Sequence, residues 1–496
     1  MRWRHRTSQR SARGITTTYT YDALNRLTAI SYPNTALNVS IGYDLWESNC
    51  TGTQIFEVGR MTHYIDSSGS TQFCFDRFGN LSRKVQSLAA AMYNITDSGY
   101  DKMGRPMELT EPRGTAVYYT RDGLGRITGI SYQLSGQGTQ TTLVSNVGYL
   151  PFGPVSSITY GTGASARTLN RTYDQDYVIG SVKDTGSGGL DLNYSRDLLG
   201  NLTQINNTGA TSGNKYLYDG LYRLTGVKDL ANNPVAAYTY DATGNRTSKT
   251  VGGVTSAYTY YPTASHWLYN VQGSTGNRSY DAAGNTTNNG NGLSFVFDNS
   301  GRMGQVLVGG VSSKVYGYDA RGERVEKTHS GDPSQTLKTV FDEQGHILGD
   351  YDGANNIIDE MIWMDDLPVG VVNGTSGTVD YIEPLPPAPI ELRDGQCGQH
   401  EIVGEEDQRL ARLGILESDA PQWRVEVRSR VVADEQDSLI ADQPCAAVDW
   451  MRVPSSHIEI RLAACHEEAA SLVEPIEAFE VDESTIYDVE RTGLWK

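Results

Sequence analysis

A short sequence unit recurs along most of this chain, and its repetition constrains the fold more than any other feature. The unit is an aromatic residue, Asp, two variable residues, Gly, and then Arg or Asn. Clear copies begin at Tyr100, Tyr240, Tyr280 and Tyr318, copies with Phe in the first place begin at Phe75, Phe297 and Phe341, and weaker copies begin at Tyr21, Arg121, Arg196 and Tyr218. Successive aspartates are often 21 to 23 residues apart, as in Asp298, Asp319 and Asp342. A fixed period of this length indicates a repeat architecture in which each unit packs on its neighbours.

Each part of the unit has a physical role in a β-hairpin. Asp in the first place and Gly in the fourth place of Asp-x-x-Gly favour a type I β-turn. The Asp side chain can accept a hydrogen bond from a backbone N–H two residues on. Gly adopts the left-handed conformation that lets such a turn close a hairpin with a G1 bulge. We therefore expect one hairpin per repeat.

Aromatic residues often recur two positions before the turn, as at Tyr216 and Tyr218 or Tyr238 and Tyr240. This spacing places both rings on one face of a strand, where rings of neighbouring hairpins can pack. A β-rich segment follows the turn, as in Arg126–Tyr132. A single hairpin cannot bury its aromatic face, so stacked hairpins are predicted to form a long, continuous and spiralling all-β sheet.

Composition divides the chain near residue 385. Residues 391–496 hold 24 acidic and 10 basic residues, which is −14 of the total net charge of −18, but they contain only one tyrosine, Tyr487. We predict a basic N-terminal leader at 1–14, the repeat region at 15–384, a proline-rich linker at 385–390 and an acidic region at 391–496. The last region is expected to be a small α+β domain or disordered.

Charge and hydropathy exclude several classes of protein. A net charge of −18 argues against nucleic-acid binding, which requires a clustered basic surface. No apolar run is long enough to span a bilayer, and no apolar segment follows the basic start to complete a signal peptide. The five cysteines are too few for a disulfide framework, although one bridge between Cys50 and Cys74 remains open in an oxidising compartment.

The repeats resemble the RHS/YD-repeat family, which includes the teneurin ectodomain shell and the cocoon proteins of insecticidal toxin complexes. The resemblance covers roughly residues 15–382. Tyr149-Leu-Pro-Phe-Gly-Pro154 is similar to a recurring variant in bacterial members, and Trp363-Met-Asp-Asp-Leu-Pro368 resembles the stretch that leads into their core region. Two departures follow: Glu383-Pro-Leu-Pro replaces a His-x-Asp-His-Leu-Gly-type segment, and no Asp-Pro-x-Gly-Leu core motif occurs.

The resemblance implies a hollow β-shell that is secreted or exposed at the cell surface. In bacterial members such a shell encloses a C-terminal toxin and acts in competition between cells. The implied partners are an encapsulated or C-terminal toxin polypeptide, a secretion-system or immunity protein, and surface glycans, without nucleic acid or a membrane span. Because the core motif is missing, no autoproteolytic residue of the family can be carried over to this chain.

No pattern in the sequence supports the assignment of a catalytic, cofactor-binding or metal-binding residue. Asp174 and Asp176 could contact a cation, but no ladder of further ligands follows, so we interpret them as a repeat turn with an extra acid. The remaining candidates for a nucleophile or zinc site lack diagnostic spacing and are interpreted as ordinary residues: Cys397, His400, Cys445, His457 and Cys465-His466-Glu467-Glu468. We expect no enzymatic activity, except for an uncharacterised one in 391–496.

Three functional hypotheses follow. The first is a structural shell that encapsulates or presents a polypeptide. The second is an adhesin whose tyrosines bind glycans, although the aromatic register favours packing within the shell. The third is a toxin carrier with an effector in 391–496. Asn80 and Asn201 match glycosylation acceptors, but both lie in hairpin turns whose composition explains them.

The acidic region itself has three interpretations. It is a toxin or effector domain, an acidic interaction domain, or an out-of-frame or inserted sequence that replaced the core. The abrupt change of composition at the expected position of the core leads us to place the third interpretation first.

Overall fold

The repeats form β-strands almost throughout the described part of the chain. The computed structural model describes residues 6–50, 56–89, 91–261, 266–384 and 413–416. Within them, each strand pairs antiparallel with its neighbours in sequence, giving one sheet of 23 strands and one of 12. The acidic region at 391–496 and the linker at 385–390 lie outside the described residues, apart from 413–416.

The first sheet holds these strands: β1 (Ser8–Arg10), β2 (Thr16–Tyr21), β3 (Leu27–Ser31), β4 (Val39–Tyr43), β5 (Met61–Asp66), β6 (Gly69–Phe75), β7 (Leu81–Leu88), β8 (Ala91–Tyr100), β9 (Pro106–Thr110), β10 (Ala116–Arg121), β11 (Ile127–Gln133), β12 (Thr141–Tyr149), β13 (Val155–Tyr160), β14 (Arg167–Tyr173), β15 (Ile179–Asp184), β16 (Asp191–Arg196), β17 (Leu202–Asn206), β18 (Gly213–Tyr218), β19 (Leu224–Asp229), β20 (Pro234–Tyr240), β21 (Arg246–Val251), β22 (Val254–Tyr260) and β23 (Leu268–Val271). Two short 3₁₀ helices interrupt it, η1 (Thr35–Leu37) and η2 (Gly163–Ser165).

The second sheet holds these strands: β24 (Ser279–Tyr280), β25 (Thr286–Asn288), β26 (Leu293–Phe297), β27 (Met303–Val308), β28 (Val311–Tyr318), β29 (Arg324–His329), β30 (Asp332–Phe341), β31 (Ile347–Asp352), β32 (Ile357–Met364), β33 (Leu367–Asn373), β34 (Val379–Pro384) and β35 (Leu413–Leu416). Pro384, the last residue of the predicted repeat region, is also the last residue of β34. Among the described residues, no helix is long and apolar enough to cross a membrane.

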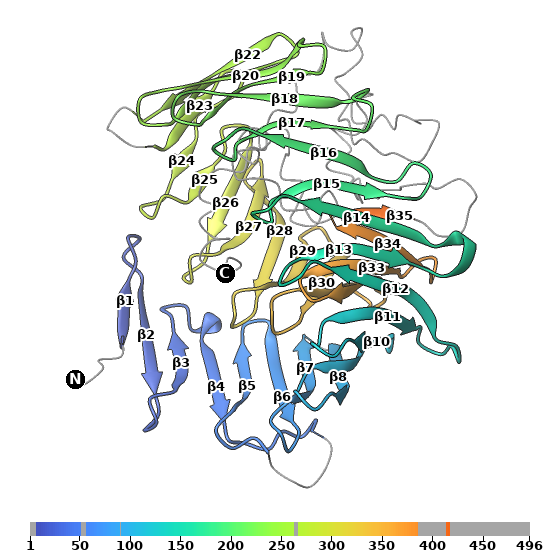
Figure 1. The fold of residues 1–496 in the computed structure, drawn as a ribbon. Helices are drawn as coiled ribbons and strands as arrows, with labels where there is room; N and C mark the ends of the chain where they lie inside the picture. Colours follow the sequence, from blue (N-terminus) through green and yellow to red (C-terminus); the bar gives the residue numbers. More distant parts are fainter. Residues whose placement is uncertain (1–5, 51–55, 90, 262–265, 385–412, 417–496) are drawn as a thin grey trace, which may run out of the picture.

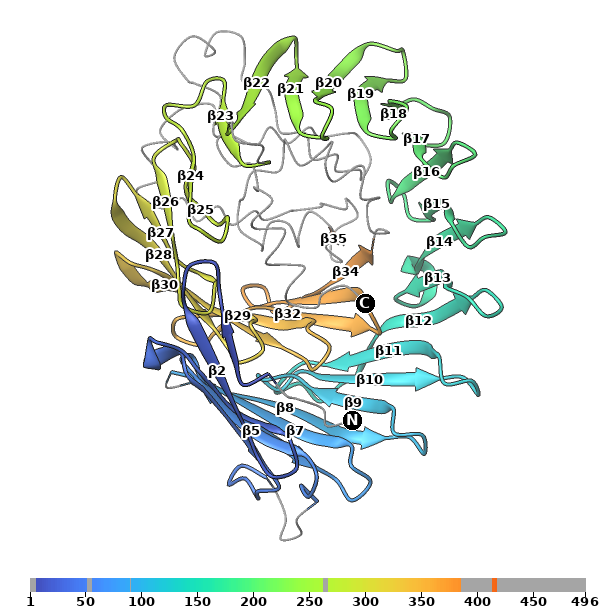
Figure 2. The ribbon, with the colours of Figure 1, turned by 90° about the vertical axis from the view of Figure 1, so that its left-hand side faces the viewer.

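The two sheets follow each other around an open ring (Figures 1 and 2). The first sheet runs along the lower part of Figure 1, then up the right side to the top, and the second sheet descends on the left and turns inward. The start of the chain lies against the second sheet, since Arg13 donates to the backbone carbonyls of Phe297 and Asp298. The strand β1 lies within the segment 1–14 that composition sets apart as a leader, so the sheet begins before residue 15.

The repeat turn has the predicted geometry, as the copy at Asp101 shows. The N–H of Gly104 donates to the Asp101 carbonyl at 3.0 Å, and Gly104 has a φ of 76°. The Asp101 carboxylate accepts from the N–H groups of Met103 and Arg105, and its second oxygen accepts from the Arg105 side chain at 2.7 Å. These bonds, led by the Arg105 side chain, lower the pKa of Asp101 to about 2. The sixth residue of the unit is therefore the internal partner of the Asp, a role that the sequence analysis left unassigned.

Where the first residue of the unit is tyrosine, its side chain joins the repeat to the one before it. Its tyrosine hydroxyl donates to the backbone carbonyl of the residue that follows the unit in the preceding repeat. The pairs and distances are Tyr43 to Leu27 at 3.0 Å, Tyr149 to Ile127 at 2.7 Å, Tyr173 to Val155 at 2.9 Å, Tyr218 to Leu202 at 2.8 Å, Tyr240 to Leu224 at 2.7 Å and Tyr318 to Met303 at 2.9 Å. At each step of this ladder the bond satisfies a backbone carbonyl group and the tyrosine hydroxyl.

Arginines of the unit add a second link between repeats. Arg223 lies 4.7 Å from the centre of the Tyr240 ring in the following repeat, and Arg26 lies 4.3 Å from that of Tyr43. Such contacts are attractive because the ring face carries negative potential. The predicted aromatic face is confirmed, since Tyr216 and Tyr238 are buried together with the flanking leucines and valines of their repeats. The all-β, spiralling repeat architecture is thus confirmed.

Candidate functional site

The spiral overlaps itself, and this overlap is the candidate functional region. We call residues 61–196 the first wall, residues 311–384 the inner turn, and the contact between them the seam. In Figure 2 the inner turn lies on the concave side of the first wall. Two buried apolar clusters hold the seam together. One joins β7 and β8 to β29–β31, and the larger one joins β10–β15 to β32–β34.

Buried polar side chains fix the far end of the inner turn. The Tyr160 hydroxyl donates to the Ile382 carbonyl at 2.5 Å, and Arg171 donates to the Pro384 carbonyl at 2.5 Å. Arg167 lies 3.0 Å from the Glu383 carboxylate and also pairs with Asp184. Burial raises the pKa of Glu383 and lowers the pKa of Arg167. Loss of the Arg167 charge would leave the buried Glu383 and Asp184 carboxylates without this cation, which is strongly destabilising.

Glu360 fixes the middle of the seam. Its carboxyl group accepts from the Tyr351 hydroxyl at 2.8 Å, the Thr115 hydroxyl at 3.0 Å and the Arg113 N–H at 3.3 Å. Burial raises the pKa of this carboxyl group. Because these donors come from both layers, Glu360 links the inner turn to the first wall.

The concave face of the inner turn carries a further, smaller apolar cluster. Side chains alternate along β32, so that Ile362 faces the first wall while Met361 faces the opposite side. Met361, Val371 and Ile382 form this cluster, with relative exposures of 2%, 5% and 0%. The edge of the same layer is paired, because β35 adds antiparallel to β34 with Ile415 opposite Ile382.

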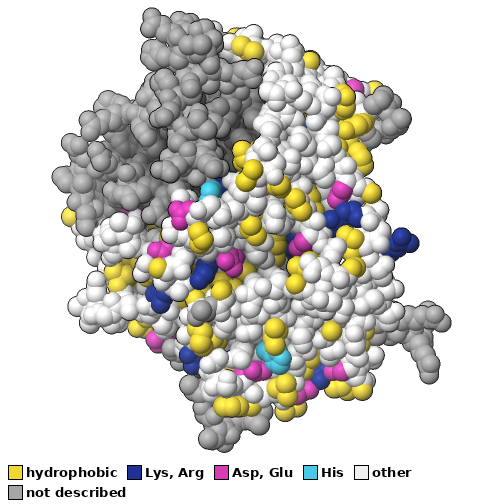
Figure 3. All heavy atoms as spheres, turned by 180° about the vertical axis from the view of Figure 1, so that it is seen from behind, with side chains coloured by type: hydrophobic (Ala, Val, Ile, Leu, Met, Phe, Trp, Pro, Cys, Tyr) yellow, Lys and Arg dark blue, Asp and Glu magenta, His cyan; other side chains and the backbone are white. Residues whose placement is uncertain are grey.

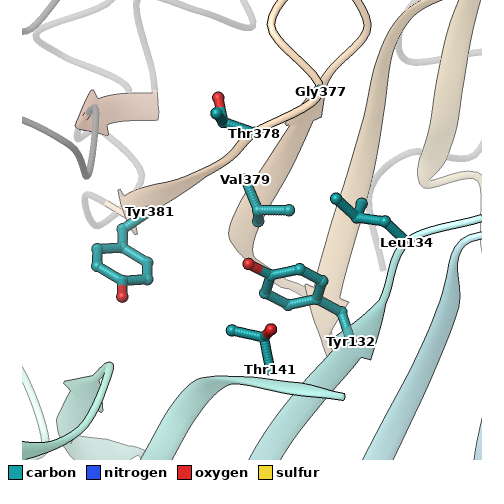
Figure 4. Close-up of a pocket in the computed structure, with 7 residues that line it drawn as sticks. All are labelled: Tyr132, Leu134, Thr141, Gly377, Thr378, Val379 and Tyr381. Carbon is teal, nitrogen blue, oxygen red and sulfur yellow. The ribbon is translucent and has the colours of Figure 1, made fainter. Parts of the chain in front are cut away.

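A pocket opens where the first wall meets the start of β34 (Figure 4). It has a volume of about 390 Å³ and is lined by Tyr132, Leu134, Thr141, Gly377, Thr378, Val379 and Tyr381. Figure 4 shows the Tyr132 ring and Thr141 rising from the first wall toward Val379. The lining offers aromatic rings and hydroxyl groups without a charged side chain, so its chemistry suits a neutral polar ligand.

The outer surface, unlike the uncharged lining of the pocket, carries both charged and apolar side chains. Figure 3 shows charged side chains of both signs interspersed among uncharged ones on the face opposite that of Figure 1. Large apolar side chains at the third position of several repeat turns are exposed: Leu24, Phe78, Met103, Leu124, Leu199 and Leu221. The visible part of this face carries no single-sign patch that would suit a polyanion.

The residues that the sequence singled out as possible ligands or glycosylation sites make hydrogen bonds within the repeat turns. Asp174 accepts from the N–H groups of Asp176 and Val178, both at 2.9 Å, as in the other repeat turns. Asn80 and Asn201 donate their side-chain amides to the aspartates of their own turns. No cluster of three or more metal-ligating side chains occurs among the described residues.

Cys50 and Cys74 form a disulfide bridge, which is the pair that the sequence analysis left open. The candidates in the acidic region, Cys397, His400, Cys445, His457 and 465–468, lie outside the described residues. Sequence reasoning missed the buried charges of the seam. Arg167 and Glu383 are separated by 216 positions and belong to no shared motif, so no local signal could have paired them.

Comparisons with known proteins agree with this architecture. The RHS Repeat family model matches residues 4–37, and the Teneurin YD-shell model matches residues 156–337. No curated protein matches the chain.

Among solved structures, the Photorhabdus luminescens Tc holotoxin pore is similar with a TM-score of 0.59 and 17% identity, over 76% of this chain and 22% of that chain. TcdB2-TccC3 is similar with a TM-score of 0.57 and 17% identity, over 75% and 22% respectively. The chain thus spans about a fifth of the length of these relatives, and at this identity the likeness concerns the fold. By its repeat motif, its hairpin sheet and these matches, the chain is similar to RHS/YD-repeat proteins and has the fold of a YD-type β-shell.

Proposed function

We propose that this chain is the wall of a YD-repeat container that holds a polypeptide, its own C-terminal region, on the concave side of the inner turn. The main support for this proposal is the pairing of β35 with β34, because it joins a segment beyond the repeats to the edge of the inner turn. Main-chain pairing at a sheet edge gives affinity with little demand on side-chain sequence. The wall would act by enclosure and protection, without a catalytic step.

The buried cluster of Met361, Val371 and Ile382 supports the same proposal. Apolar side chains on a concave face stabilise the shell only when they are removed from water. One similar protein is consistent with a separable C-terminal part, since TcdB2-TccC3 has also been solved without its hypervariable C-terminal region, with a TM-score of 0.58 to this chain. For this chain, a toxin in residues 391–496 and a role in competition between cells are part of the proposal.

The proposed location is outside the cell or at its surface. The Cys50–Cys74 bridge supports this location, because disulfides persist in oxidising compartments.

Hydrogen exchange on the full chain tests the container. The amides of 413–416 should be protected, and Ile415→Pro should abolish this protection and loosen Val379–Pro384, because proline interrupts strand pairing. Ile415→Val is the matched control and should behave as the unaltered chain. Exchange of 413–416 at the rate of an unstructured peptide in the unaltered chain would refute the proposal.

A second candidate function is glycan binding at the pocket of Figure 4. Tyrosine rings pack on apolar sugar faces while hydroxyl groups bond to the rim, and the uncharged lining favours neutral glycans. Tyr132→Ala should abolish retention on immobilised neutral glycans, whereas Tyr222→Ala, at an exposed turn outside the pocket, should not. Equal retention of both variants would remove this candidate.

A further inference from the structure

One repeat turn carries an acid where most of the others carry a side-chain hydrogen-bond donor. In most turns the sixth residue donates its side chain to the second oxygen of the Asp, as Arg105, Arg126, Arg223, Asn80, Asn201, Asn245 and Asn285 do. In the turn that follows Tyr318 this residue is Glu323. Its backbone N–H still donates to Asp319 at 3.0 Å, so the turn keeps its form although the residues at its two ends, Asp319 and Glu323, are both acids.

This turn is also a contact across the seam. The second oxygen of Asp319 accepts from the Tyr64 hydroxyl of the first wall at 3.1 Å. In return, Asp66 of the first wall accepts from the N–H of Ala320 at 2.6 Å. Asp319 is 5% exposed and Tyr64 is 2% exposed, so the contact is shielded from water. Burial raises the pKa of Asp66 as well, which adds a third acid to the same contact.

The charges around Glu323 come from several elements. Burial, with the Asp319 carboxylate next, raises the pKa of Glu323 to about 7. Arg321 and Lys84 oppose this rise, whereas Asp342 in the following turn adds to it. Lys84 cannot neutralise the pair alone, because its ammonium group is also held by the Phe341 carbonyl at 2.7 Å and the Glu343 carboxylate at 3.1 Å.

We propose that Glu323 and Asp319 form a proton-dependent latch that closes the seam when they share one proton and loosens it when both are ionised. A protonated Glu323 donates its hydroxyl to Asp319, which is the role that Arg or Asn has in other repeats. Two ionised carboxyl groups in one partly buried turn repel each other. The repulsion acts on the turn that Tyr64 and Asp66 hold, so opening of the seam at β5, β6 and β28 relieves it.

The direction of the pH dependence follows from the two states of Glu323. Its pKa is about 7 in the closed seam and close to the ordinary glutamate value of about 4.3 once the seam opens into water. The closed seam therefore binds the proton more tightly, and its extra stability is complete below the lower pKa and lost as pH rises through the higher one. Between pH 5 and pH 8.5 the opening constant should rise on the order of a hundredfold.

Hydrogen exchange tests the latch in the full chain. After correction for intrinsic exchange, the protection of Met61–Asp66 and Gly69–Phe75 should fall on the order of a hundredfold from pH 5 to pH 8.5. Glu323→Gln keeps a donor that cannot ionise, so it should retain the acid-state protection at pH 8.5. Glu326→Gln on the next strand is the matched control and should show the unaltered dependence.

Two results would overturn the latch. The first is equal amide protection of the seam strands at pH 5 and pH 8.5 in the unaltered chain, a measurement that requires no variant. The other is a Glu323→Gln variant that folds and keeps the pH dependence of the unaltered chain.

Discussion

Substitutions at the seam can distinguish the stability that comes from packing between the two layers from the stability that comes from packing between neighbouring repeats. Leu143 is fully buried in the cluster between β12 and the inner turn. Leu143→Ala removes three carbon atoms, which is worth roughly 2.4 kcal/mol of transfer free energy at 0.8 kcal/mol per methylene group. The backbone of β33 packs directly on this side chain, since a Cβ added at Gly370 would lie 2.8 Å from a Leu143 methyl group.

The neighbouring backbone cannot collapse into the space that Leu143 leaves, because β33 is hydrogen-bonded on both sides. A residual cavity adds to the transfer free energy, so the total loss is expected to be about 3–5 kcal/mol. The loss should be local to the seam, because repeat sheets open in parts. Hydrogen exchange should therefore show reduced protection in Leu367–Asn373.

Leu224→Ala is the matched control. Leu224 is 2% exposed and lies in a cluster that belongs to the first sheet alone. The same three carbon atoms are removed, but reduced protection should appear in Leu202–Asn206 and Pro234–Tyr240, with the inner turn unchanged. If both variants lowered protection in the same segments, the distinction between seam and repeat packing would be wrong.

Three further predictions concern single contacts. Tyr240→Phe removes the bond to the Leu224 carbonyl but keeps the ring, so thermal unfolding should show a loss of about 1 kcal/mol, and no measurable loss would contradict the ladder. Reduction of Cys50–Cys74, which are 24 positions apart, should cost about 3.5 kcal/mol on chain-entropy grounds, and an unchanged melting temperature with reductant would exclude this role. Burial lowers the pKa of His346, but the bond to Asp342 and the charge of Asp366 outweigh it and raise this pKa above its ordinary value. The stability that protonated His346 contributes is therefore complete below about pH 6.5 and is lost as pH rises through the raised pKa. His346→Arg should therefore melt at a higher temperature than the unaltered chain at pH 8.5 and close to it at pH 5.5, and parallel melting curves would argue against the ion pair.

Local chemistry explains why the repeat region could be predicted from the sequence. Asp and Gly act within one turn, and the G1 bulge at Gly104 needs only residues within four positions of Asp101. The two-residue spacing of Tyr238 and Tyr240 likewise states which face of a strand is aromatic. These signals recur, so the hairpins, their antiparallel pairing and their stacking into one continuous sheet follow from the sequence.

Contacts between distant residues could not be predicted in this way. Tyr160 and Ile382 are separated by 222 positions, and neither segment contains a sequence signal that predicts their contact. The overlap depends on the accumulated twist and curvature of many hairpins, which no single repeat encodes. Glu323 shows the same limit, because the sequence marks it as a departure from the unit, but only the overlap places Tyr64 and Asp66 beside its turn. The sequence by itself thus determined a hairpin sheet, whereas the tertiary structure decided where that sheet meets itself and which charges are buried there.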